Sequence, residues 1–260
     1  MILRRVIEHV KEQNWTAIAI DFVIVVLGVF VGIQVSNWNA ALGDAQRGRA
    51  YLQRLKADLE QDRDAQGSLA DYFGAVLESV ERTDALLSDA KADPQELVVE
   101  AYRASEINYR APARATWDEI VSSGDTGLLP REVADSAARY FAFDTARSSL
   151  EVLTASAYRH RVRIIIPLAL QKALRAGCSD VRNQTQVITG FMPGCKLEAD
   201  AGTIAATAAA LRADPAVQAE LRFQYSDVYS ARANIAGDVA EIERALAALA
   251  GLRSPAEAAR

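Results

Sequence analysis

The chain has 260 residues, half of them hydrophobic, and its 34 acidic and 29 basic residues give a net charge of −5. An acidic balance lacks the basic footprint of nucleic-acid-binding proteins, so no nucleic acid partner is expected. The hydrophobic share is enough to bury one sizeable domain core, and only residues 254–260 are expected to form a flexible C-terminal tail.

An apolar run of 19 residues lies close to the N-terminus, Ala17–Val35 (AIAIDFVIVVLGVFVGIQV). A helix of this length spans roughly the ~30 Å hydrocarbon core of a bilayer. Trp15 and Trp38 flank the run and suit the two interfacial belts in which tryptophan is enriched. The pattern predicts a transmembrane helix over 16–38 and a single pass through the lipid bilayer.

A cleaved signal peptide is the alternative interpretation, because Arg4, Arg5 and Lys11 precede the run. The run is longer than the roughly 7 to 15 apolar residues of a signal peptide, and Gln34 and Asn37 follow where a cleavage site would carry small residues. We therefore expect an uncleaved signal anchor.

The orientation follows from the short positive flank, because a long following domain is translocated largely regardless of its charge. This rule predicts a cytoplasmic N-tail over 1–15 and a domain over 39–253 on the outer side of the membrane. In a Gram-negative bacterium the chain would then be a single-pass inner-membrane protein with a periplasmic domain.

Cysteine usage fits an oxidising compartment. The two cysteines, Cys178 and Cys195, enclose the turn-rich segment SDVRNQTQVITGFMPG, which is too polar to fold alone. A disulfide closing this loop would contribute about 3 kcal/mol in the chain-entropy model. Two unpaired thiols are the alternative, and the lack of a nearby histidine disfavours a metal site.

The external domain begins with a charged helix pattern that carries an apolar seam at 3.5-residue spacing, which is typical of a coiled coil. Two polar residues, Asp62 and Gln66, occupy seam positions. The apolar seam residues are Leu52, Leu55, Leu59, Leu69, Phe73, Val76, Val80 and Leu87.

Capping signals divide the middle of the chain. Asp93 and Pro94 predict the start of a helix that ends before Asn108. Thr116 and Glu119 have the spacing of a capping box for the short helix TWDEIVSS. Gly124, Asp125 and Gly127 are expected to end that short helix.

The C-terminal half is expected to be helical as well. One helix is predicted from Pro130 to about Ala176, kinked by Pro167. An alanine-rich helix over 203–212 follows the cysteine loop, and Asp214 with Pro215 starts a last long helix that ends at Gly251. No strand-like alternation competes over a useful length. The fold class is therefore expected to be all-α: a transmembrane helix continuing into a stalk and a bundle of long antiparallel helices.

The transmembrane helix offers a possible contact face. Gly28 and Gly32 form a GxxxG pair, and at 100° per residue Asp21 and Asn39 fall on the same stripe. Small residues allow close helix approach, and an intramembrane acid usually faces protein. A homodimer or a heteromeric membrane partner is expected here. The alternative is a chance GxxxG pair with Asp21 reaching the interface.

The apolar segment ends in a distinctive way, with Gln34, Asn37, Trp38 and Asn39 following Asp21 and a Val/Ile/Gly-rich span. Together with RAYLQRLKADLEQD and TWDEIVSSGDTGLL, this pattern resembles a family of uncharacterised bacterial single-pass membrane proteins whose transmembrane helix ends in Gln-x-x-Asn-Trp-Asn. The family has no assigned function, so the resemblance implies topology and adds no chemistry.

No catalytic constellation stands out. Only His9 and His160 are present, and the sequence contains no phosphate loop, GxSxG, HExxH or calcium-loop motif. We therefore expect neither an enzyme nor a cofactor.

Two polar groupings remain as weak candidates for ligand binding. His160 and Arg163 lie in an arginine-rich stretch, and His160 is expected on the apolar stripe, where a layer with Asp62 and Gln66 could pair these groups or hold a small anion. The alternatives are a solvated arginine face, a histidine satisfied in the core, and seam residues that only fix register.

The second grouping combines Arg110, Arg114 and Trp117 beside a helix N-terminus, an arrangement that suits an anion. Solvated loop arginines are the alternative. Taken together, the sequence favours a membrane-anchored helical scaffold or interaction module. A sensor-like domain that binds a small ligand and signals through a membrane partner is the alternative function.

Overall fold

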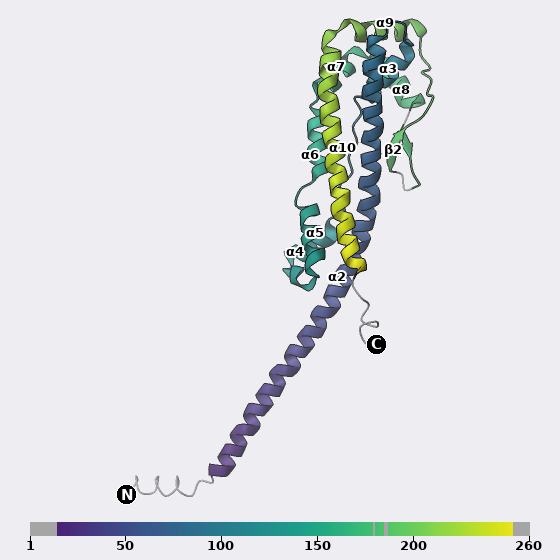
Figure 1. The fold of residues 1–260 in the computed structure, drawn as a ribbon. Coiled ribbons are helices and arrows are strands. Elements are labelled where there is room, and N and C mark those ends of the chain that lie inside the picture. Colours follow the sequence, from purple (N-terminus) through teal and green to yellow (C-terminus); the bar gives the residue numbers. More distant parts are fainter. Residues whose placement is uncertain (1–14, 179, 185–186, 252–260) are drawn as a thin grey trace. The chain divides into compact units, whose positions relative to one another are not determined.

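The computed structural model describes residues 15–178, 180–184 and 187–251 (Figure 1). Residues 1–14 of the expected cytoplasmic tail and the expected C-terminal tail, 254–260, lie outside the described residues. The side chains of Trp15 and Asp21 also lie outside them. The chain divides into two compact units, residues 1–51 and residues 52–260.

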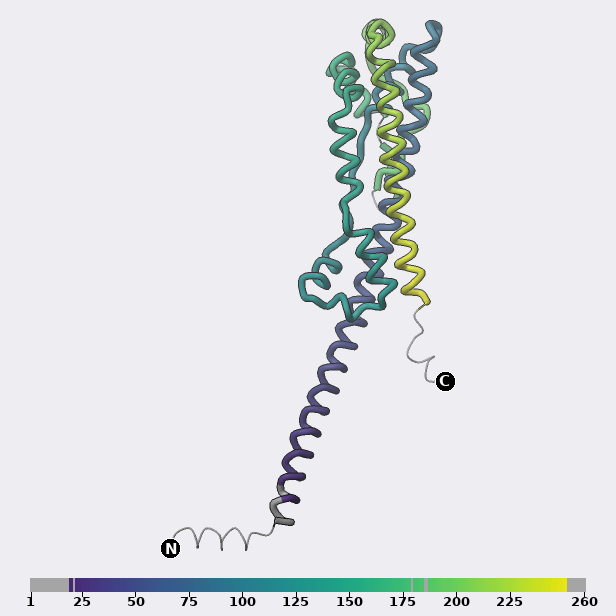
Figure 2. The backbone as a smooth tube through the Cα atoms, turned by 60° about the vertical axis from the view of Figure 1, so that its left-hand side comes forward, coloured from purple at the N-terminus to yellow at the C-terminus, as the bar shows by residue number. Residues whose placement is uncertain are grey.

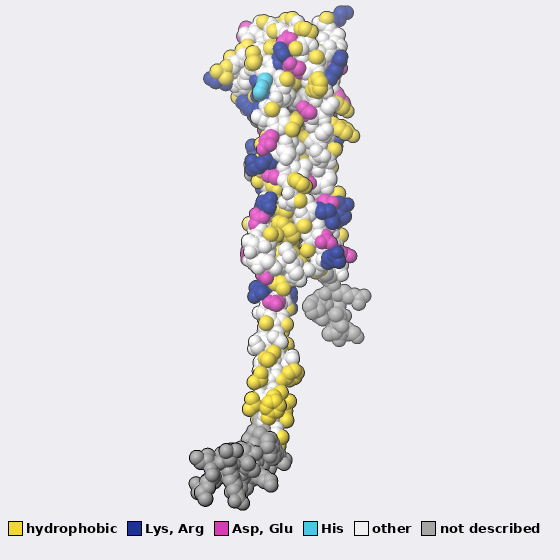
Figure 3. Space-filling model, turned by 90° about the vertical axis from the view of Figure 1, so that its left-hand side faces the viewer, with side chains coloured by type: hydrophobic (Ala, Val, Ile, Leu, Met, Phe, Trp, Pro, Cys, Tyr) yellow, Lys and Arg dark blue, Asp and Glu magenta, His cyan; other side chains and the backbone are white. Residues whose placement is uncertain are grey.

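Helix α2 (Trp15–Ser88) is, within the described ranges, the one helix long and apolar enough to cross a membrane. None of its most apolar 18-residue window is buried, unlike the core helix of a soluble protein. Figure 3 shows hydrophobic side chains gathered on this part of the helix. The expected apolar helix is therefore present, and its insertion in a membrane stays a prediction.

Residues 52–260 form a helical bundle. The C-terminal part of α2 and α10 (Pro215–Ala250) lie side by side and run antiparallel (Figures 1 and 2). Helices α5 (Arg131–Phe141), α6 (Thr145–Thr154) and α7 (Ala157–Ile165) follow one another along α10. The expected all-α bundle of long antiparallel helices is confirmed.

Shorter elements complete the bundle. Helix α3 (Pro94–Arg103) packs against α9 (Ala201–Ala213). Helix α4 (Ala115–Ser122) is followed by the single 3-10 turn η1 (Asp125–Leu128), and α8 (Leu168–Gly177) follows α7. Gly124, between α4 and η1, has a φ of 73°, a conformation that glycine adopts without strain.

A small antiparallel hairpin, β1 (Asp180–Arg182) with β2 (Ile188–Phe191), lies within the cysteine loop. Asp180 pairs with Phe191, and the register shifts between Val181 and Arg182. The sequence pattern predicts no strand here, because each of the two strands is only three or four residues long. Such a short hairpin is not stable alone and needs the packing and the crosslink around it.

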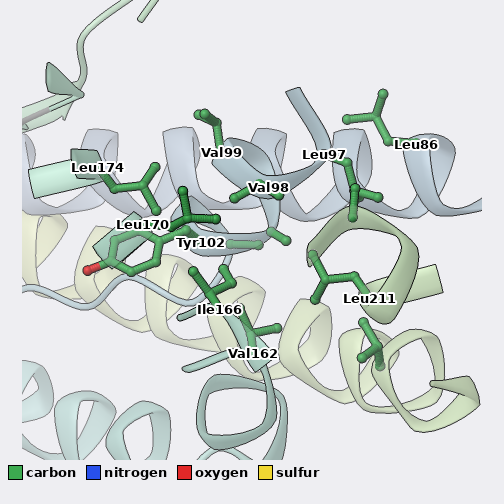
Figure 4. Close-up of a cluster of buried hydrophobic side chains, with 14 of the residues drawn as sticks. Leu86, Leu97, Val98, Val99, Tyr102, Val162, Ile166, Leu170, Leu174 and Leu211 are labelled. Atoms are coloured by element: carbon green, nitrogen blue, oxygen red, sulfur yellow. The ribbon is translucent and has the colours of Figure 1, made fainter. Parts of the chain in front are cut away.

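The seam predicted for α2 forms the core. Leu55, Leu59, Leu69, Phe73, Val76 and Val80 are buried, whereas Leu52 and Leu87 at the seam's ends are only half-buried. A second cluster joins α2, α3, α7, α8, α9 and α10. Figure 4 shows Tyr102 of this cluster beside Leu170 and Leu174, with its hydroxyl pointing away from Leu97.

Two predicted helix starts are confirmed with their capping bonds. The Asp93 carboxylate accepts a hydrogen bond from the Gln95 amide at 3.1 Å, and Asp214 accepts one from the Ala216 amide at 3.0 Å. In both cases proline follows the cap, where its missing N–H costs no hydrogen bond.

The single helix predicted from Pro130 to about Ala176 is wrong, because the segment forms four helices, α5 to α8. Two polar side chains start new helices inside it. Asp144 accepts a hydrogen bond from the Arg147 amide at 2.9 Å, and Ser156 accepts one from the Arg159 amide at 3.3 Å. Pro167 separates α7 from α8, so it breaks the helix where a kink was expected.

The predicted capping box is also wrong. Helix α4 begins at Ala115, so Arg114 occupies the cap position and makes no side-chain capping bond. Thr116 lies in the first turn and is buried, because the cap position is two residues before the one that the sequence favours.

Candidate functional site

The expected disulfide is present. Cys178 at the end of α8 is bonded to Cys195 after β2, across a sequence separation of 17 residues. The bond encloses the β1–β2 hairpin and fixes both of its ends. Together with the packing of Phe191 on Tyr72, with ring centroids 5.3 Å apart, the crosslink restricts where Asp180 and Phe191 lie.

The candidate contact face of the transmembrane segment is open in the structure. No atom lies within 4 Å of a Cβ built on Gly28 or Gly32, and Asn39 is exposed. Trp38 is 65% exposed, and its role as an interface anchor stays a prediction. The remaining predicted members, the side chains of Asp21 and Trp15, lie outside the described residues.

Asp62 and Gln66 are buried in the bundle, as their seam positions predict. Both carboxylate oxygens of Asp62 accept from the Ala113 amide at 2.9 Å, and the Tyr140 hydroxyl donates to it at 2.9 Å. Gln66 donates to the Arg110 carbonyl at 3.4 Å. Burial is the main reason that the pKa of Asp62 is raised. These residues hold the connecting segment 104–114 against α2.

Arg110, Arg114 and Trp117 do not converge on an anion site. The Arg110 side chain is exposed, and the Arg114 guanidinium binds the Asp118 carboxylate at 3.0 to 3.1 Å. Trp117 is buried and stacks on Phe141, with ring centroids 5.8 Å apart. The predicted site is replaced by a local ion pair and a core contact.

The structure does not bring His160 and Arg163 together with Asp62 and Gln66. His160 is exposed, so its expected position on the apolar stripe is wrong. Its neighbour Arg161 faces α10, where it binds Glu220 through two hydrogen bonds of 2.7 Å. Arg163 points to the other side of α7, toward Glu106.

Glu106 is the centre of a second polar cluster. Its side chain is 7% exposed, and it lies on the connecting segment 104–114. Arg163 donates to its carboxylate at 2.9 Å, and Arg175 of α8 lies 3.1 Å from the same oxygen. Arg163 also donates to the Ser105 hydroxyl at 3.0 Å. Two arginines from separate helices therefore neutralise one buried carboxylate.

Tyr102 contacts both of these arginines. The Arg163 guanidinium carbon is 3.6 Å from the ring centroid, and the Arg175 carbon is 5.6 Å from it. Arg175 also donates to the Tyr102 hydroxyl at 3.0 Å. Stacking and hydrogen bonding together fix both guanidinium planes.

Two more arginines complete the group, which we call the Glu106 cluster: Tyr102, Arg103, Glu106, Arg159, Arg163 and Arg175. Arg103 donates to Glu100 at 3.1 Å and lies over the Phe191 ring at 5.2 Å. Arg159 donates to the Ser105 carbonyl. Burial, followed by the charge of Arg163, lowers the pKa of Arg159.

The cluster borders a small surface hollow of about 130 Å³, here called the Glu106 hollow. Its lining includes Tyr102, Arg103, Glu106, Arg175, Asp180 and Phe191. The disulfide-enclosed hairpin supplies Asp180 and Phe191. Burial and the nearby Glu106 charge raise the pKa of the Asp180 carboxyl.

Sequence reasoning selected one member of this cluster among its candidate site residues, Arg163. The one-turn spacing of Arg159 and Arg163 on α7 was a usable signal, because residues four apart share a helix face. Glu106, Arg175 and Asp180 lie in separate elements, and no spacing in the sequence connects them.

Comparisons of the chain with family models, with curated protein sequences and with solved structures found no match.

Proposed function

We propose that the chain is a membrane-anchored helical interaction module, with the apolar part of α2 in the inner membrane and the bundle on the periplasmic side. Arg4, Arg5 and Lys11 before the apolar run support this orientation. The Cys178–Cys195 disulfide is compatible with an oxidising compartment. The proposal includes membership of the family of single-pass proteins that the Asn-Trp-Asn ending resembles. It assigns no catalytic residue and no cofactor.

The proposal rests mainly on the hydrogen bonds of two polar seam residues of α2, Asp62 and Gln66. The Asp62 carboxylate and the Gln66 amide nitrogen bind the chain's own segment at Ala113 and Arg110, and the buried Gln66 Oε1 is left without a hydrogen-bond partner. Among the described residues, the middle of the bundle is therefore filled mainly by the chain itself. A filled bundle with a charged surface is suited to contact with other proteins. Figure 3 shows acidic and basic side chains interspersed over one face of it.

The proposed contact in the membrane uses Gly28 and Gly32. Their exposed face lets a second helix approach closely, either from another copy of this chain or from a different membrane protein. Isoleucine at both positions would hold the helices apart.

The test is crosslinking of the full-length protein in native membranes, with mass spectrometry of the captured proteins. Wild type is compared with Gly28→Ile/Gly32→Ile and with a matched control, Val23→Ile/Val26→Ile, which adds bulk on the opposite helix face. We expect crosslinked partners or dimers that the glycine variant loses and the valine variant keeps. Recovery of monomer alone from wild type, or an unchanged pattern in the glycine variant, would contradict the proposal.

A second candidate function is sensing of a small ligand, transmitted through a membrane partner. One observation favours it: the Glu106 hollow combines partly exposed charged groups with an aromatic wall. Such convergence of a few polar groups at an apolar surface is typical of small-molecule sites.

A further inference from the structure

The Glu106 hollow presents groups of both charges to the same small volume. Arg103 and Arg175 supply the positive charge, and Glu106 and Asp180 supply the negative charge. A water molecule takes about 30 Å³ in the liquid, so a hollow of this size holds a molecule of only a few non-hydrogen atoms. The ligand must therefore be small, and it must be compatible with both signs of charge.

The Asp180 carboxylate is an unused acceptor. It makes no hydrogen bond and no ion pair with any residue in the described ranges, although it is half-buried. The positive charges of Arg175, of Arg182 on the same strand and of Arg103 act on it electrostatically and lower its pKa, in that order of size. Glu106, by contrast, already has two arginine partners. A half-buried carboxylate without a partner favours a cationic group beside it.

Arg175 is an unused donor in the same hollow. Its Nε and one terminal nitrogen bind Tyr102 and Glu106, whereas the other terminal nitrogen, Nη1, makes no hydrogen bond within the described ranges. Its side chain is 56% exposed, and its plane is fixed by those two contacts. A fixed guanidinium with a free edge is a good receptor for a carboxylate.

In the Glu106 cluster, the guanidinium groups outnumber the carboxylates that pair with them. Four guanidinium groups belong to it, and two carboxylates, Glu100 and Glu106, pair with them. The hydrogen bond of the Arg159 guanidinium goes to a backbone carbonyl. This excess attracts the carboxylate end of a ligand.

We propose that the Glu106 hollow binds a free α-amino acid with a short side chain, as its zwitterion. The ligand's carboxylate binds Arg175, its ammonium group binds Asp180, and its side chain faces Phe191. A simple carboxylate would leave Asp180 without a partner, and a simple amine would face the arginines. The proposal rests on the second candidate function, ligand sensing, and is independent of the interaction role.

The first test compares three probes of similar size on the full-length protein in detergent micelles by titration calorimetry. L-alanine carries both charged groups, propionate lacks the ammonium group and ethylamine lacks the carboxylate. We expect saturable binding of L-alanine, with propionate and ethylamine at least about ten-fold weaker. Absence of alanine binding, or equal binding of propionate, would overturn the proposal.

The second test uses two variants with matched controls. Arg175→Gln and Asp180→Asn should each weaken alanine binding about ten-fold or more, whereas Lys172→Gln, an exposed change on the same helix, should not. The Asp180 side chain makes no hydrogen bond or ion pair with the described residues, so Asp180→Asn is expected to keep the fold and remains informative if Arg175→Gln unfolds the protein. Unchanged alanine affinity in Asp180→Asn would overturn the proposal.

Mass spectrometry of the protein as isolated distinguishes failure of the proposed ligand class from failure of the proposed sensing function. A co-purified molecule other than an amino acid, lost in Arg175→Gln, would overturn the ligand class and retain the sensing function. A co-purified short-chain amino acid, lost in the same variant, would support both.

Discussion

Two buried carboxylates hold the same connecting segment, 104–114, and they are satisfied in opposite ways. Asp62 of α2 receives only neutral donors, the Ala113 amide and the Tyr140 hydroxyl. Glu106, on the segment itself, receives the guanidinium groups of Arg163 and Arg175. Both carboxylates are nearly inaccessible to solvent.

We therefore interpret Asp62 as a structural contact and the Glu106 cluster as the candidate binding surface. The Asp62 carboxylate is hydrogen-bonded by neutral donors, which bring no charge with them. The Asp62 site therefore consists of those hydrogen bonds alone. Arginines are larger and carry further donors, and Arg175 extends from buried Glu106 to the surface. The proposed binding of a small polar ligand therefore belongs to the Glu106 cluster and not to Asp62.

The largest effect is expected from removing the charged centre. Glu106→Ala leaves Arg163 and Arg175 without their buried partner, and breaking a buried ion pair from one side costs about 3–5 kcal/mol. The measurement is the free energy of unfolding from urea titration of the full chain in detergent, with exposed Glu151→Ala as the control. A loss below about 1 kcal/mol would show that the arginines do not depend on Glu106.

Removal of the disulfide should affect the two sites unequally. Cys178→Ser with Cys195→Ser is expected to cost about 3 kcal/mol, because the unfolded chain regains the freedom of the closed loop. Hydrogen exchange then tests locality: amides of β1 and β2 should lose protection, whereas the Ala113 amide should keep it. Equal loss at both places would mean that the hairpin supports the whole bundle.

Asp62→Ala is expected to cost about 2–3 kcal/mol, less than Glu106→Ala, since it leaves uncharged donors unpaired. Asp64→Ala is the matched control, because Asp64 is two residues away and 72% exposed. Urea unfolding of both variants measures the difference. A loss for Asp62→Ala that exceeds the Glu106→Ala value would reverse the proposed contrast.

The smallest effect concerns a third carboxylate, Asp238 on α10, which has one hydroxyl donor, Thr145 at 3.3 Å. Burial, with smaller contributions from Asp144 and Glu241, raises its pKa to about 6. The folded state therefore binds this proton more tightly than the unfolded state. The stability it supports is present in acid and is lost as pH rises from about 4 to about 6.

Asp238→Asn should accordingly stabilise the protein at pH 8 and leave its stability at pH 4 almost unchanged. Solvent screening of this half-buried group limits the gain to about 1 kcal/mol. Urea unfolding at the two pH values is the measurement. A gain at pH 4 equal to that at pH 8 would exclude the titration of Asp238 as its cause.

The elements that the sequence predicts best depend on local chemistry. The α2 seam is a periodic signal, and Asp93 and Asp214 cap the helices that follow them through bonds within two residues. The burial of Asp62 and Gln66 also follows from the seam's phase. The hydrogen-bond partners of Asp62 do not follow from the seam's phase, because Ala113 and Tyr140 are 51 and 78 residues away in the sequence.

The incorrect predictions have a common physical origin. Asp144 and Ser156 can cap a helix or lie within one. The packing of α5 to α7 against α10 favours the capping role. The Glu106 cluster gathers side chains from α3, α7, α8 and the segment between α3 and α4, so it exists only in the folded chain. Arg163 alone could be selected, as part of an arginine-rich run.

The proposal that α2 holds a helical module outside the cytoplasm is tested most directly by the location of the C-terminal domain. The measurement is reporter activity of fusions after Gly251 in a Gram-negative host, with alkaline phosphatase, which is active in the periplasm, compared with a cytoplasm-dependent fluorescent protein. We expect a membrane-bound, active phosphatase fusion and a dark fluorescent fusion. A fluorescent fusion with inactive phosphatase would place the bundle in the cytoplasm and contradict the proposed topology.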